Sequence, residues 1–382
     1  MKRTLFTEDH EDFRSMVRDF LAREVVPVFP QWLEQELIPR DFFRSIAKIG
    51  IMGMGIDEEY GGSGPADYLY NVVLNEETAR ALVHLGPLRC HTDVVMPYFR
   101  AYADEEQRRR WFPSIASGDL FTAIAMTEPG TGSDLAGIRT SAVRDGDDYI
   151  LNGAKTFITG GITADLVIVV ARTSTDAENR RNGLTLLVVE DGMPGFEKGR
   201  KLDKIGLAVQ DTAELSFSDV RVPARNVLGE EGKAFSYLGQ NLAGERLSIA
   251  SGAICAAQAA LDVTIAYTKD RQVFGKPVAS FQNTKFELAA VATDIEAGQA
   301  MFDRAAAEHI KEELSAVDAA KTKLFCTELQ ARTVDRCLQL FGGYGYMNEY
   351  PIARLYADAR VSRIYGGTSE VLKTIISKSL GL

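Results

Sequence analysis

The sequence predicts an α+β multidomain protein, in which a helical N-terminal domain (residues 1–119) and a helical C-terminal domain (residues 231–382) flank a middle β domain (residues 120–230). Three observations predict this order. Apolar residues recur at helical spacing in the first third, short β-branched runs follow, and long alanine-rich segments fill the remainder. With 382 residues, 46% of them apolar, the chain is long enough to bury a sizeable core.

The first domain is expected to be helical throughout. Residues 13–21 place five apolar side chains on one helical face, and Thr7 can cap the start of that helix. Further helices are expected near residues 40–50, 66–82 and 104–117.

The middle domain is expected to be a β-barrel or a β-sandwich. Its short apolar or alternating runs are separated by Gly, Asp and Asn turns: FTAIAM, DDYILNG, DLVIVVAR, GLTLLVVE and AELSFSDVRV. No long helical pattern interrupts them, which argues against a parallel βαβ sheet.

The C-terminal domain is expected to be a bundle of antiparallel helices. Helical periodicity returns at about Gly232, and the segments near residues 235–268, 280–311 and 315–340 lack internal proline.

Composition excludes several classes of protein. A net charge of −10 argues against general affinity for nucleic acid or for an anionic membrane. The four cysteines form no C-x-x-C pair, so we expect buried thiols in a reducing compartment and no metal site. No apolar signal core or membrane-spanning run is visible, so we expect a soluble protein of the cytoplasm, or of an organelle matrix after processing.

A glycine-rich turn, TEPGTGSDLAG, follows the first strand-like run. It is not a dinucleotide fingerprint, because Leu135 stands where the third glycine belongs and no helix-then-strand unit follows. Its backbone N–H groups and hydroxyls can hold a phosphate or the edge of a heterocycle, but a plain β-turn explains the same residues.

Three further segments also have two interpretations. Phe157 in KTFITGG can cover a planar ring or belong to the core, and Arg271 can bind a pyrophosphate or lie on the surface. The glycine pair Gly342-Gly343 can allow close approach of a ligand or simply end a helix.

The order of these segments is more informative than any one of them. TEPGTGSD, NGAKTFITGG, DRQVFGKP, LQLFGGYGY and ARVSRIYGGTSEV resemble the successive signatures of the acyl-CoA dehydrogenases, and the resemblance covers essentially the whole chain. It implies the fold of that family, with a middle β-barrel and a C-terminal four-helix bundle. It also implies bound FAD and the formation of a double bond between Cα and Cβ of an acyl thioester, with flavin N5 accepting a hydride.

The resemblance also implies the cofactor site. Met126, Thr127, Gly132 and Ser133 would lie beside the flavin or its pyrophosphate, and Phe157, Ile158 and Thr159 would lie against the isoalloxazine ring. The adenosine diphosphate part would be bound, in part by a neighbouring subunit, by Arg271, Phe274, Gln282, Gln339, Gly342 and Gly343. Thr368 and Glu370 would complete the pocket.

The catalytic base requires a separate argument. Many members carry glutamate immediately after the tyrosine of the final motif, where this chain has Gly366. The long-chain and isovaleryl branches, which this chain resembles most, place the base in a segment similar to NLAGERLSIASGA, so Glu245 would be the base and Gly366 would leave space for it. An acid near the start of a helix at about Leu242 has a simpler explanation in the helix dipole, and that alternative stays open.

The same comparison implies substrate contacts. Ser133, Tyr365, Gly366 and Gly367 would surround the thioester, with backbone N–H groups near Gly367 stabilising its oxygen, and Arg246 would contact the nucleotide of CoA. Val95 would line the floor of an apolar tail pocket that accepts a long or branched acyl group. Ala243 replaces an aspartate of several members, which leaves acyl carrier protein open as an alternative carrier.

The function expected from the resemblance is that of an FAD-dependent acyl-CoA dehydrogenase of fatty acid oxidation. Its partners would be an acyl-CoA, an electron-transferring flavoprotein and three further copies of the chain in a homotetramer. Three alternatives remain: a dehydrogenase of acyl groups on acyl carrier protein, an oxidase that uses oxygen directly, and a flavin-binding protein without turnover.

Overall fold

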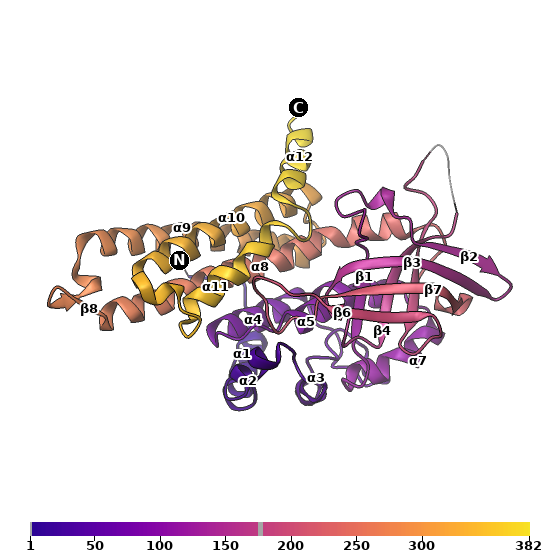
Figure 1. Cartoon of the computed structure of the whole chain (residues 1–382), viewed down its shortest axis with the longest axis horizontal. Coiled ribbons are helices and arrows are strands. Elements are labelled where there is room, and N and C mark those ends of the chain that lie inside the picture. Colours follow the sequence, from indigo (N-terminus) through magenta and orange to yellow (C-terminus); the bar gives the residue numbers. More distant parts are fainter. Residues whose placement is uncertain (1, 175–178) are drawn as a thin grey trace.

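The computed structural model describes residues 2–174 and 179–382, and three regions follow one another along the chain. Helices make up the first region, a curled seven-stranded sheet the second and long helices the third (Figure 1). The predicted α+β architecture is confirmed.

The N-terminal region is a layer of short helices that packs below the C-terminal helices in Figure 1. The helix α1 begins directly after Thr7, as predicted, and the Thr7 N–H donates to His10 Nδ1 at 3.1 Å. The helices are α1 (Glu8–Phe20), α2 (Phe29–Gln35), α3 (Arg40–Ala47), α4 (Tyr68–Arg80), α5 (Gly86–Arg89), α6 (Met96–Tyr102) and α7 (Glu105–Ala116). Two π-helical segments, Leu21–Val25 and Cys90–Val95, interrupt this series.

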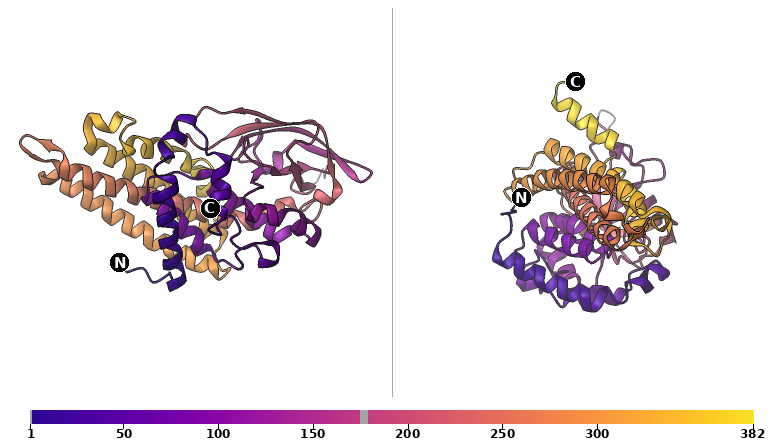
Figure 2. Two further views of the ribbon diagram at one scale, coloured as in Figure 1. Left: turned by 90° about the horizontal axis from the view of Figure 1, so that it is seen from below. Right: turned by 90° about the vertical axis from the view of Figure 1, so that its left-hand side faces the viewer.

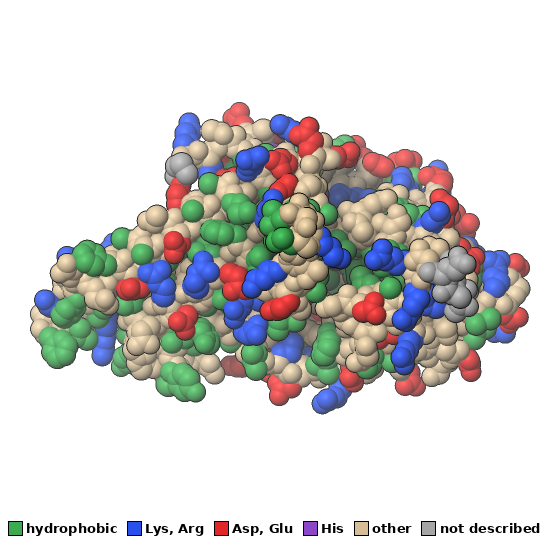
Figure 3. Space-filling view, turned by 90° about the horizontal axis from the view of Figure 1, so that it is seen from above, with side chains coloured by type: hydrophobic (Ala, Val, Ile, Leu, Met, Phe, Trp, Pro, Cys, Tyr) green, Lys and Arg blue, Asp and Glu red, His purple; other side chains and the backbone are tan. Residues whose placement is uncertain are grey.

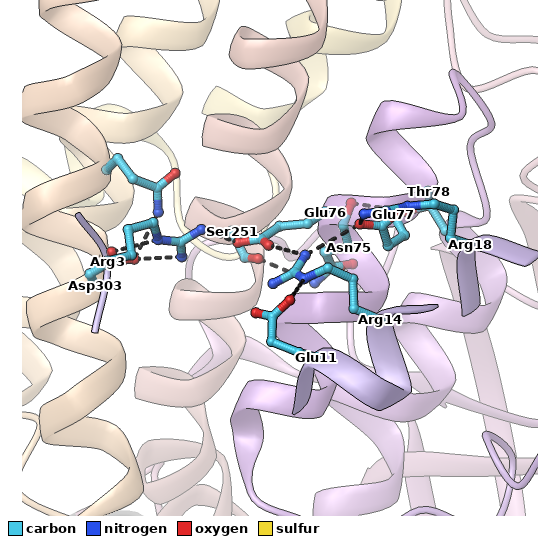
Figure 4. Close-up of polar contacts among 11 residues, drawn as sticks. Arg3, Glu11, Arg14, Arg18, Asn75, Glu76, Glu77, Thr78, Ser251 and Asp303 are labelled. Carbon is cyan, nitrogen blue, oxygen red and sulfur yellow. Dashed lines mark hydrogen bonds and ion pairs between the residues drawn. The ribbon is translucent and has the colours of Figure 1, made fainter. Parts of the chain in front are cut away.

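Ion pairs fasten α1 and α4 to the C-terminal helices (Figure 4). Arg3 bridges Glu76 on α4 and Asp303 on the long helix α9, with N–O distances of 2.6 and 2.7 Å. Arg14 of α1 contacts the same Glu76 at 2.6 Å and Glu77 at 3.3 Å. Because these side chains are largely buried, the network fixes α4 against the bundle.

The middle region is one sheet in the order β1-β4-β2-β3-β7-β6, with β5 paired to β4. Its strands are β1 (Thr122–Ala125), β2 (Ser141–Asp145), β3 (Asp148–Ile158), β4 (Leu166–Arg172), β5 (Leu184–Glu190), β6 (Phe196–Lys201) and β7 (Ala213–Pro223). β1 and β4 are parallel, whereas β4 and β5, β3 and β7, and β6 and β7 are antiparallel.

Both faces of the central strands are buried. In β4, residues 166, 168 and 170 pack in a core with Phe99 and Trp111, whereas residues 167, 169 and 171 pack in a core with Phe43 and Phe121. This burial on two sides explains why DLVIVVAR is almost wholly apolar.

The C-terminal region contains three long helices with two shorter ones: α8 (Ala234–Asp270), α9 (Gln282–Ile310), α10 (Ala316–Phe341), α11 (Pro351–Ala359) and α12 (Ser369–Ser379). The helix α11 packs on α8 and α10 as the fourth helix of the bundle, and α12 projects from the body of the molecule (Figures 1 and 2). A hairpin of β8 (Gln272–Val273) and β9 (Lys276–Pro277) joins α8 to α9 at the tip of the bundle.

One helix in the described part of the chain, α8, is long and apolar enough to cross a membrane. In its most apolar window, 61% of the residues are buried inside the protein, the environment of a core helix. All four cysteines are free thiols.

Candidate active site

Glu245 lies in the middle of a helix and not at its start. The helix α8 begins at Ala234, eleven residues earlier, so about three turns precede Glu245. The expected helix start near Leu242 was wrong. The dipole of a helix terminus acts only within its first turn, so it does not explain a carboxylate here.

The carboxyl group of Glu245 is enclosed by protein and held by one hydrogen bond. Only 8% of the residue is exposed, and Tyr98 Oη on α6 donates to Glu245 Oε1 at 2.7 Å. No ion pair to Glu245 occurs within residues 2–174 and 179–382. Burial raises its pKa to about 7, against the smaller opposing effects of the Tyr98 hydrogen bond and Arg246.

The final motif packs against α8 one turn after Glu245. Gly366 has φ +62°, and a Cβ at this position would lie 2.2 Å from Ile249 Cδ1. The space beside Gly366 is therefore occupied by Ile249, which corrects the expectation that it receives Glu245.

Lys323 fixes the adjacent Gly367. The completely buried lysine on α10 donates from Nζ to the Gly367 carbonyl oxygen at 2.7 Å, which holds a turn with φ +98°. Burial, together with nearby Arg246, lowers the pKa of Lys323 to about 8. Because the lysine holds the carbonyl, the orientation of the glycine backbone is set from inside the bundle.

Arg246 follows Glu245 on α8 and lies near enough to Lys323 to lower the pKa of that lysine. It is 6% exposed, its Nε has no hydrogen-bond partner among the described residues, and burial lowers its pKa. A buried guanidinium nitrogen without a partner is costly, which makes this side chain suited to binding an anionic or polar ligand.

The first group of predicted flavin residues lies together at the ends of β1 and β3. Lys155, completely buried, donates to the Met126 carbonyl at 3.0 Å and pairs with Glu128 at 2.9 Å, and burial lowers its pKa to about 8. Glu128 accepts the N–H groups of residues 139 and 140, so it ties down the glycine-rich turn. The Thr156 N–H donates to the Thr127 carbonyl, which joins the two segments.

Phe157 belongs to this group and is not a core residue. It is 68% exposed and has φ +60°, an unusual backbone conformation for a bulky side chain. Its neighbour Ile158 is buried, and Thr159 Oγ1 accepts a hydrogen bond from Gln210 at 2.8 Å. Gly132 and Ser133 are exposed on the turn, and a Cβ at Gly132 would meet nothing within 4 Å. An open shelf with an exposed aromatic ring fits a planar cofactor.

The second group lies at the tip of the bundle. Arg271, Gln339, Gly342 and Gly343 line a pocket of about 650 Å³. Phe274, in the β8–β9 turn, is 95% exposed with φ +50°, and exposed Gln282 begins α9. Along α8, Arg271 is 26 residues from Glu245, about 39 Å. The pocket at Arg271 therefore lies far from Glu245 of the same chain.

Thr368 and Glu370 begin the projecting helix α12. Thr368 Oγ1 caps the helix by accepting the Val371 N–H at 3.3 Å, and Glu370 is exposed. In a space-filling view, the surface is hollowed beside this helix, with Lys and Arg side chains at the margin (Figure 3).

The region expected to hold an apolar tail is polar. Glu245 lines a cavity of about 310 Å³ together with Asn71, Asp93, Arg100 and His309, whereas Val95 is completely buried in an apolar core. Tyr98, Lys323, Arg89 and Asp93 were all missed from the sequence. The π-helical turn at Cys90–Val95 changes the spacing of side chains, so an ordinary helical pattern misplaces Asp93 within it and Tyr98 after it.

Family models match three consecutive segments: residues 7–119 match the acyl-CoA dehydrogenase N-terminal domain, residues 123–220 the middle domain and residues 232–381 the C-terminal domain. The chain belongs to the acyl-CoA dehydrogenase family. It is 45% identical over 378 residues to the mitochondrial long-chain specific acyl-CoA dehydrogenase of Sus scrofa, with 99% of this chain and 88% of that protein covered. The predicted resemblance is confirmed.

Solved structures agree with this assignment. The crystal structure of acyl-CoA dehydrogenase from Geobacillus kaustophilus has a TM-score of 0.97 and 46% identity, with 100% of both chains covered. A glutaryl-CoA dehydrogenase from Mycobacterium smegmatis, solved in complex with FADH2, has a TM-score of 0.89 and 30% identity, with 98% of this chain and 95% of that chain covered.

Proposed function

We propose that this protein is an FAD-dependent acyl-CoA dehydrogenase in which Glu245 removes the α proton of the acyl thioester. The observation that carries the proposal is the Glu245 carboxyl group, buried beside the final motif with a pKa raised to about 7. A base with a pKa near the working pH is partly ionised and still accepts a proton well.

The residues present fit FAD. The exposed ring of Phe157 and the open turn at Gly132 would hold the flavin end, and Arg271 with the glycines of the 650 Å³ pocket would hold the nucleotide end. When bound, the flavin supplies the hydride acceptor.

The chain itself supplies the proton chemistry. Burial and nearby Glu245 raise the pKa of Tyr98 well above its usual range, so Tyr98 keeps its proton and donates it as a hydrogen bond to the carboxylate. Glu245 takes the α proton, while backbone N–H groups at Gly366 and Gly367 are available to the thioester oxygen as negative charge develops on it. Lys323 holds that turn in place.

We also propose the assembly, the partners and the location of the protein. Because Arg271 at the bundle tip lies about 39 Å along α8 from Glu245, we expect each site to be completed by a second chain in a homotetramer. Arg246 would bind the nucleotide of CoA. Electrons would leave to an electron-transferring flavoprotein, in a bacterial cytoplasm or an organelle matrix.

The test is anaerobic mixing of the FAD-loaded protein with a series of acyl-CoAs, followed by flavin absorbance. We expect bleaching by wild type and at least a thousand-fold slower bleaching by Glu245→Gln, because removing the general base removes about that factor. Equal bleaching by the two proteins would remove Glu245 from the role of base. Bleaching by no thioester would contradict the dehydrogenase proposal.

The unfolding temperature of Glu245→Gln serves as the folding control. The raised pKa means that the ionised Glu245 destabilises the folded state once the pH exceeds the ordinary value of 4.5, and fully so above about 7. Glu245→Gln should therefore unfold at a higher temperature than wild type at pH 8. That result would show that lost bleaching does not reflect lost folding.

A further inference from the structure

Arg89, at the end of α5, is a half-buried cation with few partners. Its Nη2 donates to Tyr365 Oη at 3.1 Å, the only hydrogen bond of its side chain among the described residues. No carboxylate oxygen lies within 4.0 Å of its nitrogens in residues 2–174 and 179–382. A guanidinium carries five N–H donors and stays protonated, so most donors of Arg89 remain free for a ligand in the cavity that this residue lines.

That cavity is small, and polar and apolar residues line it together. It measures about 110 Å³ and is lined by Asn75, His84, Gln330 and Tyr365 as well as Arg89. This volume holds several water molecules and is enough for the polar end of a tail.

The helix α8 has a gap that admits Arg89. A Cβ on Gly252 would lie 1.8 Å from Arg89 Nη1, so any larger residue would displace the guanidinium. Gly252 is seven residues after Glu245, which places both on one face of α8 about 10 Å apart. Ile249 lies between them and contacts Gly366, the neighbour of Tyr365. The base and Arg89 therefore stand at two ends of one surface.

The nearest acids are already occupied. Asp93 accepts hydrogen bonds from Asn71 at 2.5 Å, Thr92 at 2.7 Å and Ser248 at 2.6 Å, all neutral donors. This carboxylate therefore has its own partners and does not pair with Arg89.

Asp358 of α11 lines the same cavity and is occupied as well. Its Oδ1 accepts the Leu207 N–H, and Arg354 is the cation beside it. Neither acid forms an ion pair with Arg89.

We propose that Arg89 binds a carboxylate at the far end of the acyl tail, so that the substrates are acyl-CoAs with a terminal carboxyl group. This inference rests on the proposed dehydrogenase function and names its substrate class. A carboxylate accepts two parallel N–H bonds from a guanidinium, whereas a methyl terminus would leave the donors unpaired. Sites that hydrogen-bond a substrate group reject analogues without it far better than apolar pockets separate chain lengths.

The test compares CoA thioesters in pairs of equal carbon number, one tail ending in a carboxylate and its twin in a methyl group. The holoenzyme is assayed by flavin reduction, and the ratio of kcat/KM for the two twins is measured across tail lengths. We expect a ratio of at least tenfold in favour of the carboxylate at the best length. A preference of wild type for the methyl twin at every length would overturn the inference, while turnover of those twins would leave the dehydrogenase function intact.

Variants test whether the charge of Arg89, and not a change in the fold, sets this ratio of kcat/KM values. Arg89→Met should lower the ratio tenfold or more, and Arg89→Lys less. Arg109→Met removes one charge from a side chain that is 69% exposed on α7, and should leave the ratio unchanged. An unchanged ratio in Arg89→Met would also overturn the inference. If Arg89→Met does not fold, Gly252→Ala tests the same point, because its Cβ displaces the guanidinium.

A binding measurement decides the case in which nothing is turned over. Calorimetric Kd values for the same pairs on the holoenzyme should favour the carboxylate twin in wild type and lose that preference in Arg89→Met. Preference without turnover would support Arg89 and contradict the dehydrogenase proposal, whereas equal binding of the twins would contradict Arg89.

Discussion

At the residue scale, Glu245 and Tyr98 form a pair whose properties depend on burial. Removing water from a carboxyl group favours its neutral form, and a hydroxyl donor favours its charged form. In this protein burial has the larger effect, since the pKa rises to about 7 despite the 2.7 Å hydrogen bond. Tyr98 therefore keeps the pKa of Glu245, the proposed base, from rising further above neutral pH.

This pair predicts a pH dependence. Because the base must be ionised, kcat/KM should be high above pH 7 and fall as the pH drops through about 7. Tyr98→Phe removes the hydrogen-bond donor and raises the pKa of Glu245 further. The fall of kcat/KM at low pH should therefore begin at a higher pH in this variant. A hydrogen bond to a charged group contributes about 1.5 kcal/mol or more, so the expected move is about one pH unit.

Tyr102→Phe is the matched control. Tyr102 lies one turn further along α6, and its hydroxyl donates to Gln240 at 2.8 Å and not to Glu245. Its pH profile should match wild type. A Tyr98→Phe profile that also matches wild type would show that the hydroxyl does not tune the base.

Residues differ in how far the sequence could identify them. Glu245 could be proposed because it lies in a recognisable segment and because Gly366 removes the other candidate. Arg89 could not, since its significance comes from a missing partner and from the gap at Gly252, and both depend on chain segments far apart in sequence. Val95 was placed in the tail pocket because its residue type was apolar, but its side chain is buried in the hydrophobic core.

At the element scale, the final motif lies against the Ile249 side chain of α8 at Gly366. Gly366 adopts φ +62°, and the Ile249 Cδ1 atom occupies the position next to its absent side chain. A glycine is required here for two separate reasons, backbone conformation and close approach.

A double-mutant cycle separates these reasons. Gly366→Ala should destabilise the protein by about 1–3 kcal/mol, from strain at positive φ and from the contact with Cδ1. Ile249→Val removes only that methyl group and should cost about 0.5–1.5 kcal/mol. The double variant should be more stable than the sum predicts by about 0.5 kcal/mol or more, measured by urea unfolding. Strict additivity would mean that the backbone strain alone requires glycine.

Elements with local signals were predicted and those without were not. The helices α4 and α7 begin at Asp67 and Asp104, whose side chains accept the N–H groups of Leu69 and Gln107 at 2.8 Å. The strand β6 has the sequence FEKGRK, which carries no β-strand signal, and forms because β7 offers it an edge to pair with.

At the scale of the whole molecule, the residues proposed to bind FAD divide into two groups, one on the sheet and one at the tip of the bundle. One group surrounds Phe157 on the sheet, and the other lines the pocket at Arg271 beside the β8–β9 hairpin, at the tip of the bundle that points away from the sheet (Figure 1). Exposed rings at both places, Phe157 and Phe274, indicate surfaces that are completed from outside the chain. This arrangement predicts that cofactor sites form between subunits.

Complementation between two inactive variants tests this arrangement. A Cβ on Gly132 or on Gly343 would meet nothing within 4 Å, so Gly132→Glu and Gly343→Glu should fold but place a negative charge where a pyrophosphate would bind. Each variant alone should retain little FAD. When the two are co-expressed, a site between two subunits is intact if its sheet surface comes from a Gly343→Glu chain and its bundle pocket comes from a Gly132→Glu chain. Random assembly then restores about a quarter of the sites, measured as bound flavin per chain. Retention of FAD no better in the mixture than in the separate variants would show that each site is built from a single chain.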